Sequence, residues 1–160
     1  MEKTAGKIKS LADAQAIVSA WQSKNEKVVF TNGCFDLLHL GHVDYLEKAR
    51  GLGDRLVIGL NTDDSVSRFK GPDRPLQDQN SRARVLAALQ FVDLVVFFNE
   101  STPLNLISEL IPDVLVKGSD YLAENIVGAD VVKKAGGKVE TIAFVPGYST
   151  TRIVDKIKRT

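Results

Sequence analysis

Val28-Val-Phe-Thr-Asn-Gly-Cys-Phe-Asp-Leu-Leu-His-Leu-Gly-His42 is the stretch that organises this chain of 160 residues. Its first residues are apolar and rich in β-branched side chains, which is typical of a buried strand, and an amphipathic helical pattern follows His42 directly. Between the two, Asn32 and Gly33 tolerate a positive φ and predict a turn whose backbone N–H groups face one point. A strand, a turn and a helix N-terminus in this order predict a site for the phosphates of a nucleotide.

The two histidines of the chain, His39 and His42, both lie in this stretch and flank Gly41. Residues three apart in a helical turn project from one face, and Gly41 leaves room for a ligand to approach the backbone. Two imidazoles at an anion site could stabilise charge that develops on a phosphoryl group. Two other interpretations are purely structural histidines and a zinc pair. A zinc site needs three or four ligands, and the sequence offers no credible third ligand nearby.

The rest of the chain alternates short apolar runs with helical patterns, which predicts an α/β fold with a doubly wound, five-stranded parallel sheet and helices on both faces. We expect one domain over residues 27–160, preceded by a helical lead-in over residues 1–26. The predicted strands are 28–31, 55–60, 94–98, 113–117 and 138–144. The predicted helices are 10–24, 43–50, 62–69, 81–89, 102–110, 125–135 and 149–158, with Ser10, Thr62 or Asp63, Thr102, and Ser149 or Thr150 as N-caps.

Ligands of such sheets bind beyond the carboxyl ends of the strands, where the strand order switches. This rule points to the loops at 31–42, 61–75, 98–102, 117–121 and 145–152. Four of these loops carry notable polar residues. The loop at 98–102 contributes little besides Asn99 and Glu100, and we assign it no role.

Composition excludes several classes of protein. The chain has 21 basic and 20 acidic side chains, so nothing favours a nucleic-acid or membrane partner. The single cysteine, Cys34, excludes an internal disulfide and is interpreted as a small buried residue instead of a nucleophile. No apolar run reaches the ~20 residues of a membrane span, and the first residues lack the apolar core of a signal peptide. We therefore expect a cytoplasmic protein.

The segment Gly33 to His42 resembles the phosphate-binding signature of small nucleotidyltransferases, which share a histidine-x-glycine-histidine motif with class I aminoacyl-tRNA synthetases. The chain is too short for a synthetase and lacks a lysine-methionine-serine-lysine-serine loop, because its one methionine is residue 1. Within the cytidylyltransferase-like group, the resemblance extends from Lys27 over nearly the whole chain. It points to the adenylyltransferase domain of the bifunctional ADP-heptose synthesis protein, in a stand-alone form. The segments that carry it are 31–36, 53–56, 70–75, 115–121 and 149–152.

The resemblance implies a Rossmann-like fold and a reaction of ATP with D-glycero-D-manno-heptose 1-phosphate, giving ADP-heptose and pyrophosphate for lipopolysaccharide core synthesis. It implies Mg²⁺ as cofactor, bound mainly through the ATP phosphates and not by a metal site of the protein. A separate sugar kinase and a phosphatase would act in the same pathway. A homo-oligomer is also expected from the resemblance.

The same resemblance, combined with the loop positions, predicts the residues of the site. The predicted catalytic residues are His39, His42 and Lys70, and the predicted acceptor-binding residues are Asp36, Arg74 and Tyr121. The predicted nucleotide-binding residues are Thr31, Asn32, Gly33, Cys34, Phe35, Gly41, His42, Arg82, Lys117, Gly118, Asp120, Ser149, Thr150 and Thr151. For Arg82 the reasoning is electrostatic, since a cation in the first turn of a helix opposes the macrodipole and would need a purpose such as gripping phosphate.

Two other functions remain open. One is a cytidylyltransferase that acts on glycerol 3-phosphate or a similar acceptor. Related cytidylyltransferases carry an arginine shortly before the serine-threonine run, whereas residues 144–148 here hold no cation, which favours the adenylyltransferase. The other is a non-catalytic nucleotide-binding module, which has less need of two histidines, Lys70 and Arg82 at the phosphates.

Overall fold

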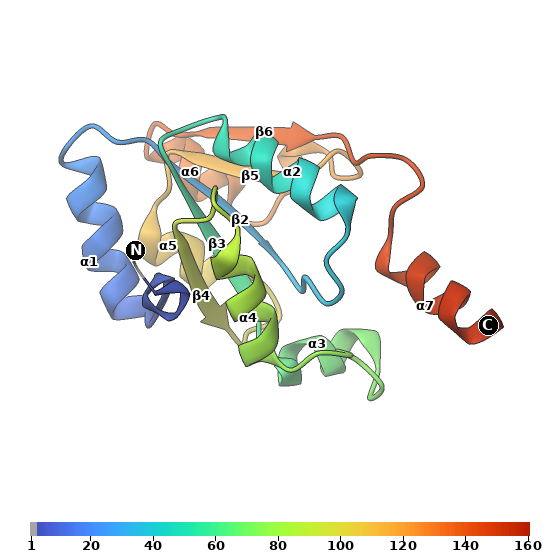
Figure 1. The fold of residues 1–160 in the computed structure, drawn as a ribbon. Helices are drawn as coiled ribbons and strands as arrows, with labels where there is room; N and C mark the ends of the chain where they lie inside the picture. Colours follow the sequence, from blue (N-terminus) through green and yellow to red (C-terminus); the bar gives the residue numbers. More distant parts are fainter. Residues whose placement is uncertain (1–2) are drawn as a thin grey trace.

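Six parallel strands form one sheet in the computed structural model, which describes residues 3–160 (Figure 1). Their order is β1-β4-β3-β2-β5-β6, so the chain leaves β2 toward β3 and β4 and later returns to the other side of β2 through β5. The switch in strand order therefore lies between β2 and β5. The strands are β1 (Ile8–Lys9), β2 (Val28–Gly33), β3 (Arg55–Asn61), β4 (Leu94–Phe98), β5 (Val114–Gly118) and β6 (Lys138–Ile142).

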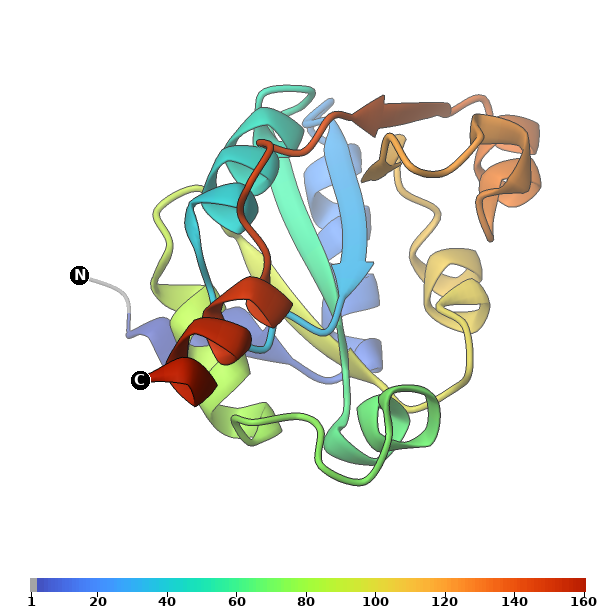
Figure 2. The ribbon, with the colours of Figure 1, turned by 90° about the vertical axis from the view of Figure 1, so that its right-hand side faces the viewer.

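Helices cover both faces of this sheet, as the alternation of strands and helices predicts. On one face, α1, α5 and α6 bury apolar side chains against the sheet, and on the other face α2 and α4 do so. The helix α7 ends the chain after a long connection from β6 and projects from the body (Figures 1 and 2). The α-helices are α1 (Leu11–Gln22), α2 (Leu40–Arg50), α3 (Asp63–Lys70), α4 (Gln79–Ala88), α5 (Leu104–Leu110), α6 (Ala129–Lys134) and α7 (Thr150–Arg159), with short 3-10 turns at Thr4–Lys7 and Ala123–Asn125.

Side-chain caps explain where several helices begin. Ser10, Thr62 and Ser149 accept hydrogen bonds from backbone N–H groups in the first turns of α1, α3 and α7, which confirms these predicted N-caps. Asp78 caps α4 in the same way, so that this helix begins at Gln79, two residues before the predicted start. The predicted cap of α5 is wrong, since Pro103 stands at the N-cap position instead of Thr102.

The structure adds a strand that the sequence did not predict. β1 is two residues long and pairs with β4, and such a short segment carries no readable hydrophobic period. Residues 3–26 of the predicted lead-in thus supply an edge strand, and α1 buries Ala14 and Val18 in the core. Residues 1 and 2 lie outside the described range. No helix within residues 3–160 has the length and apolar character needed to cross a membrane.

Candidate functional site

A cavity of about 670 Å³ opens at the carboxyl ends of β2, β3, β4 and β5, on the switch in strand order. This is the position at which open α/β sheets bind their ligands, and the volume lies within the usual ~300–1,000 Å³ of such sites. All five predicted loops contribute to its wall. The loop at 98–102 was assigned no role, and that assignment is wrong, because Phe98, Ser101 and Thr102 line the cavity.

The two histidines lie together at the start of α2. His39 stands at the N-cap position, and its ring stacks on the ring of His42 with centroids 3.9 Å apart. His42 lines the cavity, whereas His39 is not part of the cavity wall. Burial lowers the pKa of His42 to about 4, helped by the neighbouring His39 and Lys70, and burial also lowers the pKa of His39. Both rings are therefore neutral near pH 7.

Gly41 has a different role from the predicted one. A Cβ placed there would lie 3.0 Å from the ring of His39 and 3.4 Å from the Cβ of Tyr148. The space beside Gly41 thus belongs to these two side chains and not to a ligand. The glycine still matters, because it allows the His39 ring to pack against the helix.

Three polar atoms around the site are buried without a hydrogen-bond partner in the described residues. They are the Nδ1 atoms of His39 and His42 and the Oδ1 atom of Asn32. An unpaired buried polar atom costs about 1–3 kcal/mol, so folded proteins rarely retain such atoms without a use. Two of these atoms belong to residues that line the cavity, Asn32 and His42, which indicates a place for a polar ligand there.

The predicted turn at Asn32 and Gly33 is displaced along the chain. Both residues still belong to β2 and pair with β3, and the positive φ occurs at Phe35, at 47°. A Cβ on Gly33 would lie 2.9 Å from the Phe35 ring, so the glycine makes room for that ring. Asn32, Gly33, Cys34 and Phe35 nevertheless all line the cavity, as predicted for this segment.

Thr31 does not line the cavity. It is fully buried, and its hydroxyl lies 2.8 Å from the hydroxyl of Tyr45 on α2. Burial raises the pKa of Tyr45 to about 12, so this phenol stays protonated. The predicted nucleotide contact of Thr31 is therefore corrected to a bond that ties β2 to α2.

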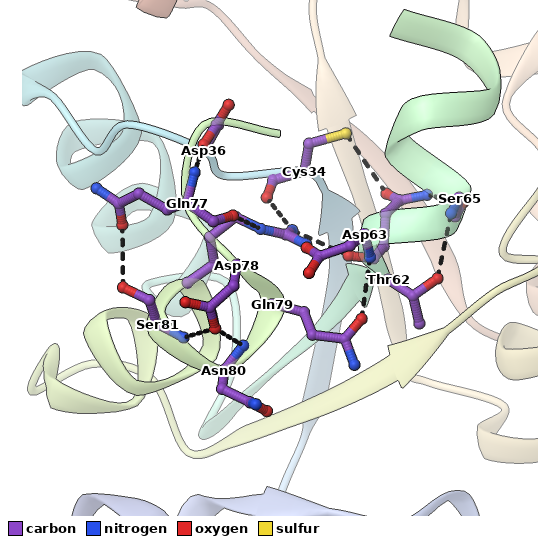
Figure 3. A network of polar contacts seen from close by, with 12 residues as sticks. Cys34, Asp36, Thr62, Asp63, Ser65, Gln77, Asp78, Gln79, Asn80 and Ser81 are labelled. Atoms are coloured by element: carbon purple, nitrogen blue, oxygen red, sulfur yellow. Dashed lines mark hydrogen bonds and ion pairs between the residues drawn. The ribbon is translucent and has the colours of Figure 1, made fainter. Parts of the chain in front are cut away.

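Arg82 is the largest correction to the predicted site. Its guanidinium is fully buried and donates to the carbonyl oxygens of Cys34, Asn61 and Gln77 and to the carboxylate of Asp63, at 2.7–3.0 Å. Figure 3 shows this network between β2, the N-terminus of α3 and α4. These hydrogen bonds stabilise the cation in the first turn of α4, so no phosphate is needed to explain its position. Arg82 is also absent from the cavity wall, so the predicted phosphate contact is wrong and its role is to join the loops beneath the site.

Asp36 and Arg74 form a second anchor. The Asp36 carboxylate is buried and accepts from Arg74 Nε at 3.0 Å and from the backbone N–H groups of Leu76 and Gln77 at 2.8 and 2.9 Å. Both side chains line the cavity, but they are committed to each other. In place of the predicted contact with the acceptor, these two residues hold the loop that follows Lys70 against the segment after β2.

Several predicted cations and polar groups do reach the cavity. Lys70, the last residue of α3, lines it, and so do Lys117, Asp120 and Tyr121 beside β5. The Lys117 ammonium lies 5.5 Å from the centre of the Tyr121 ring, and burial lowers the pKa of Lys117. A Cβ on Gly118 would lie 2.2 Å from the Phe144 ring. Phe144 therefore occupies the space beside Gly118, a residue that we predicted to bind the nucleotide.

The three residues of the serine-threonine run at the start of α7 have different roles. Ser149 caps the helix by accepting from the N–H of Arg152 at 3.2 Å. Thr150 donates to the carbonyl of Leu37 at 3.2 Å and lines the cavity. Ser149 and Thr151 are not part of the cavity wall, so their predicted nucleotide contacts have no support in this geometry.

The sequence reasoning missed Asn61, Ser65 and the aromatic residues Phe98 and Phe144, all of which line the cavity. Asn61 ends β3 one residue beyond the predicted strand, and its Nδ2 donates to Ser65 Oγ at 3.0 Å. The thiol of Cys34 points to Asn61 Oδ1 at 3.8 Å, and burial raises its pKa, which fits the predicted inert cysteine. Asn61 directly follows the apolar run of a predicted strand, and this position could have indicated that its side chain reaches the cavity.

Within residues 3–160, no three His, Cys, Asp or Glu side chains gather closely enough to hold a metal ion. Asp120 lines the cavity but does not belong to such a group. Mg²⁺ commonly keeps several waters and binds through substrate phosphates with few protein ligands.

Comparison with known proteins agrees with this geometry. The cytidylyltransferase-like family model matches residues 30–156. The bifunctional protein HldE of Magnetococcus marinus is 59% identical over 94% of this chain and 31% of its own length. The bifunctional protein HldE of Geobacter metallireducens is 58% identical over 96% of this chain and 31% of its own length. The chain thus spans about a third of the length of these curated relatives.

Two solved structures share the fold. The lipopolysaccharide core biosynthesis protein from Thermoplasma volcanium is 31% identical, with a TM-score of 0.59, over 75% of this chain and 97% of that protein. A pantoate-beta-alanine ligase from Francisella tularensis, complexed with beta-gamma ATP and beta-alanine, has a TM-score of 0.61 over 96% of this chain and 78% of its own. Its identity is 16%, so this second likeness concerns the fold alone.

Proposed function

Because this chain belongs to the cytidylyltransferase-like family, we propose that it transfers AMP from ATP to D-glycero-D-manno-heptose 1-phosphate and releases pyrophosphate. The observation that carries the proposal is 58–59% identity to bifunctional HldE proteins over 94–96% of the chain. The proposed reaction is the one implied by the sequence resemblance to the adenylyltransferase domain of the ADP-heptose synthesis protein.

The reaction needs few protein groups. An oxygen of the sugar phosphate attacks the α-phosphorus of ATP, a new P–O bond forms, and the bond between the α-phosphorus and the bridging oxygen of pyrophosphate breaks. A phosphate monoester is already a nucleophile at neutral pH, so the step requires no strong base. The protein contributes by positioning the two substrates and by stabilising charge on the phosphoryl group.

His42 is the residue best placed for charge stabilisation. It lines the cavity at the start of α2, and a helix N-terminus favours anions. Its ring is neutral before ATP binds, since its pKa is about 4, so one ring nitrogen carries a hydrogen that can be donated to a phosphate oxygen. His39 holds this ring in place by stacking. Lys70 and Lys117 supply positive charge from two other walls of the cavity.

Mg²⁺ would neutralise charge on the ATP phosphates when bound with them. The described residues fit a mainly phosphate-bound ion, with Asp120 as a carboxylate on the cavity wall. The chain's own residues then orient the polyphosphate and shield it from water.

The wider setting belongs to the same proposal. We propose that the chain works in a cytoplasmic homo-oligomer, beside a separate sugar kinase and a phosphatase. These statements rest on the resemblance to the ADP-heptose synthesis protein, whose other domain is the kinase.

A panel of nucleotides and acceptors tests the proposal. ATP or CTP is combined with D-glycero-D-manno-heptose 1-phosphate, glucose 1-phosphate or glycerol 3-phosphate, and pyrophosphate release is followed in the presence of Mg²⁺. We expect the fastest release with ATP and the heptose phosphate. Faster release with CTP and glycerol 3-phosphate would favour the cytidylyltransferase, and nucleotide binding without release for every acceptor would indicate a binding module.

A further inference from the structure

The carboxyl edge of the sheet divides the cavity into two halves of different chemistry. Side chains alternate between the faces of a strand, and the two apolar clusters show which face each position belongs to. On the face of α2 and α4 lie His42, Tyr45, Gly118, Phe144 and Thr150, which we call the histidine half.

The opposite face, covered by α1, α5 and α6, carries neutral polar groups. Asn32 follows Phe30 on this face of β2, and Asn61 follows Val57 and Gly59 on the same face of β3. We call this part the carboxamide half, and the residues of its wall are Asn32, Asn61, Ser65, Phe98, Ile126 and Val127. Lys117 lies two residues after Leu115 and adds an ammonium from the same face of β5.

The state of the two carboxamides points to a ligand with hydroxyl groups. Asn32 lines the cavity, and its Oδ1 atom is buried without a partner in the described residues. Asn61 is buried, and its amide is oriented by Ser65 at 3.0 Å. A carboxamide both donates and accepts hydrogen bonds, as a sugar hydroxyl does, and it carries no charge that would need an ionic partner.

The apolar part of this half complements such a ligand. Phe98 is nearly buried at the end of β4, and Ile126 and Val127 approach from the segment before α6. A sugar ring presents C–H groups as well as hydroxyls, so a wall that combines amides with apolar and aromatic side chains matches both. The Lys117 ammonium meets the charge of a phosphate on the same molecule.

We propose that the carboxamide half is the acceptor subsite, in which Asn32 and Asn61 bind hydroxyl groups of a sugar phosphate and so select it over shorter phosphates. Ser65 is a positioning residue that acts through Asn61. This inference rests on the proposed function, because it assigns the second substrate of that reaction to a particular wall of the cavity.

Steady-state kinetics of Asn32→Ala tests the subsite. We expect the KM for the sugar 1-phosphate to rise about tenfold or more, which is the effect of one lost hydrogen bond, while the KM for ATP stays within about twofold. The matched variant is Thr150→Val, which removes a hydroxyl from the histidine half and should alter the KM for ATP alone. Ser65→Ala should raise the acceptor KM by a smaller factor, and Ser65→Thr should restore it.

A binding experiment separates this inference from the proposed function. Side-chain amide signals of Asn32 and Asn61 are followed by NMR in the wild-type chain, saturated with a non-transferable ATP analogue, while sugar 1-phosphate is added. Shifts of both signals, together with no pyrophosphate release when ATP replaces the analogue, would support the subsite and contradict the proposed function. Normal turnover with a raised KM for ATP only in Asn32→Ala would overturn the subsite and leave the function standing. Neither turnover nor shifts would overturn both.

Discussion

Two sets of polar groups around the cavity differ in how their hydrogen bonds are satisfied. Arg82 and Asp36 are buried, and each makes several hydrogen bonds to neighbouring segments. By contrast, the Nδ1 atoms of His39 and His42 and the Oδ1 atom of Asn32 are buried without partners in the described residues. The first set stabilises the fold, whereas the second costs stability and is therefore expected to serve the ligand.

We expect the largest effect on stability from removing the guanidinium of Arg82, because it makes four hydrogen bonds. Arg82→Met deletes the four hydrogen bonds of the guanidinium and leaves three carbonyl oxygens and the Asp63 carboxylate without their donor. A buried polar group left without its partner costs about 1–3 kcal/mol, and several carbonyl oxygens lose their donor here, so we expect the free energy of unfolding to fall by about 3–5 kcal/mol. Urea denaturation measures it. Arg82→Lys should not restore stability, because lysine lacks the planar fork. A fully stable Arg82→Met protein with a raised KM for ATP would instead support phosphate binding.

His42→Ala tests the second set, the buried polar groups without hydrogen-bond partners. If the imidazole stabilises charge in the transition state, kcat should fall by a factor of about 10²–10³. The melting temperature should change little, since His42 Nδ1 has no partner to lose. Thermal denaturation and pyrophosphate release are measured on the same sample. Unchanged turnover would show that His42 takes no part in the mechanism. A large loss of stability would show that His42 stabilises the fold, as Arg82 and Asp36 do.

Asp36→Asn should have an intermediate effect on stability. The amide keeps the shape of the carboxylate but loses its charge and part of its capacity to accept from Arg74, Leu76 and Gln77. Hydrogen bonds to charged groups contribute about 1.5–3 kcal/mol, so we expect a loss within that range. The backbone amides of residues 71–78 should also exchange hydrogen faster. Unchanged exchange there would show that Asp36 does not hold this loop.

The last prediction concerns pH. The pKa of His42 is about 4 in the folded chain and near 6.5 when unfolded, so the unfolded state binds the proton more readily below pH 6.5. His42 therefore lowers the free energy of unfolding as the pH falls from about 6.5 to 4. In His42→Gln this decline should be shallower across that window, as urea denaturation at several pH values would show. Identical declines in the two proteins would place the folded pKa near its ordinary value.

The sequence predicted most of the fold because hydrophobic period and caps are local signals. The core strands of the sheet and the caps Ser10, Thr62 and Ser149 are examples. It also predicted that loops at the carboxyl ends of the strands would meet at one cavity, since parallel topology alone requires this. The two-residue strand β1 was missed because it is too short to show a period.

The site itself was predicted less well, for a different reason. Sequence reasoning can find polar residues in the right loops, but it cannot tell whether their hydrogen bonds are already taken. Arg82 and Asp36 were both assigned to ligands, and both are used within the fold. Asn61 was missed because one more residue of strand brings it into the cavity. Phe144 was not anticipated beside Gly118, since the contact joins two distant loops.

³¹P NMR of the complete reaction is the most direct test of our proposal that this chain adenylylates a heptose 1-phosphate. ATP, Mg²⁺ and D-glycero-D-manno-heptose 1-phosphate are mixed with the protein, and the phosphorus signals are followed over time. We expect pyrophosphate and the diphosphate signals of ADP-heptose to grow in equal amounts as ATP declines. Unchanged ATP and sugar phosphate, in the presence of folded protein that binds ATP, would contradict the claim.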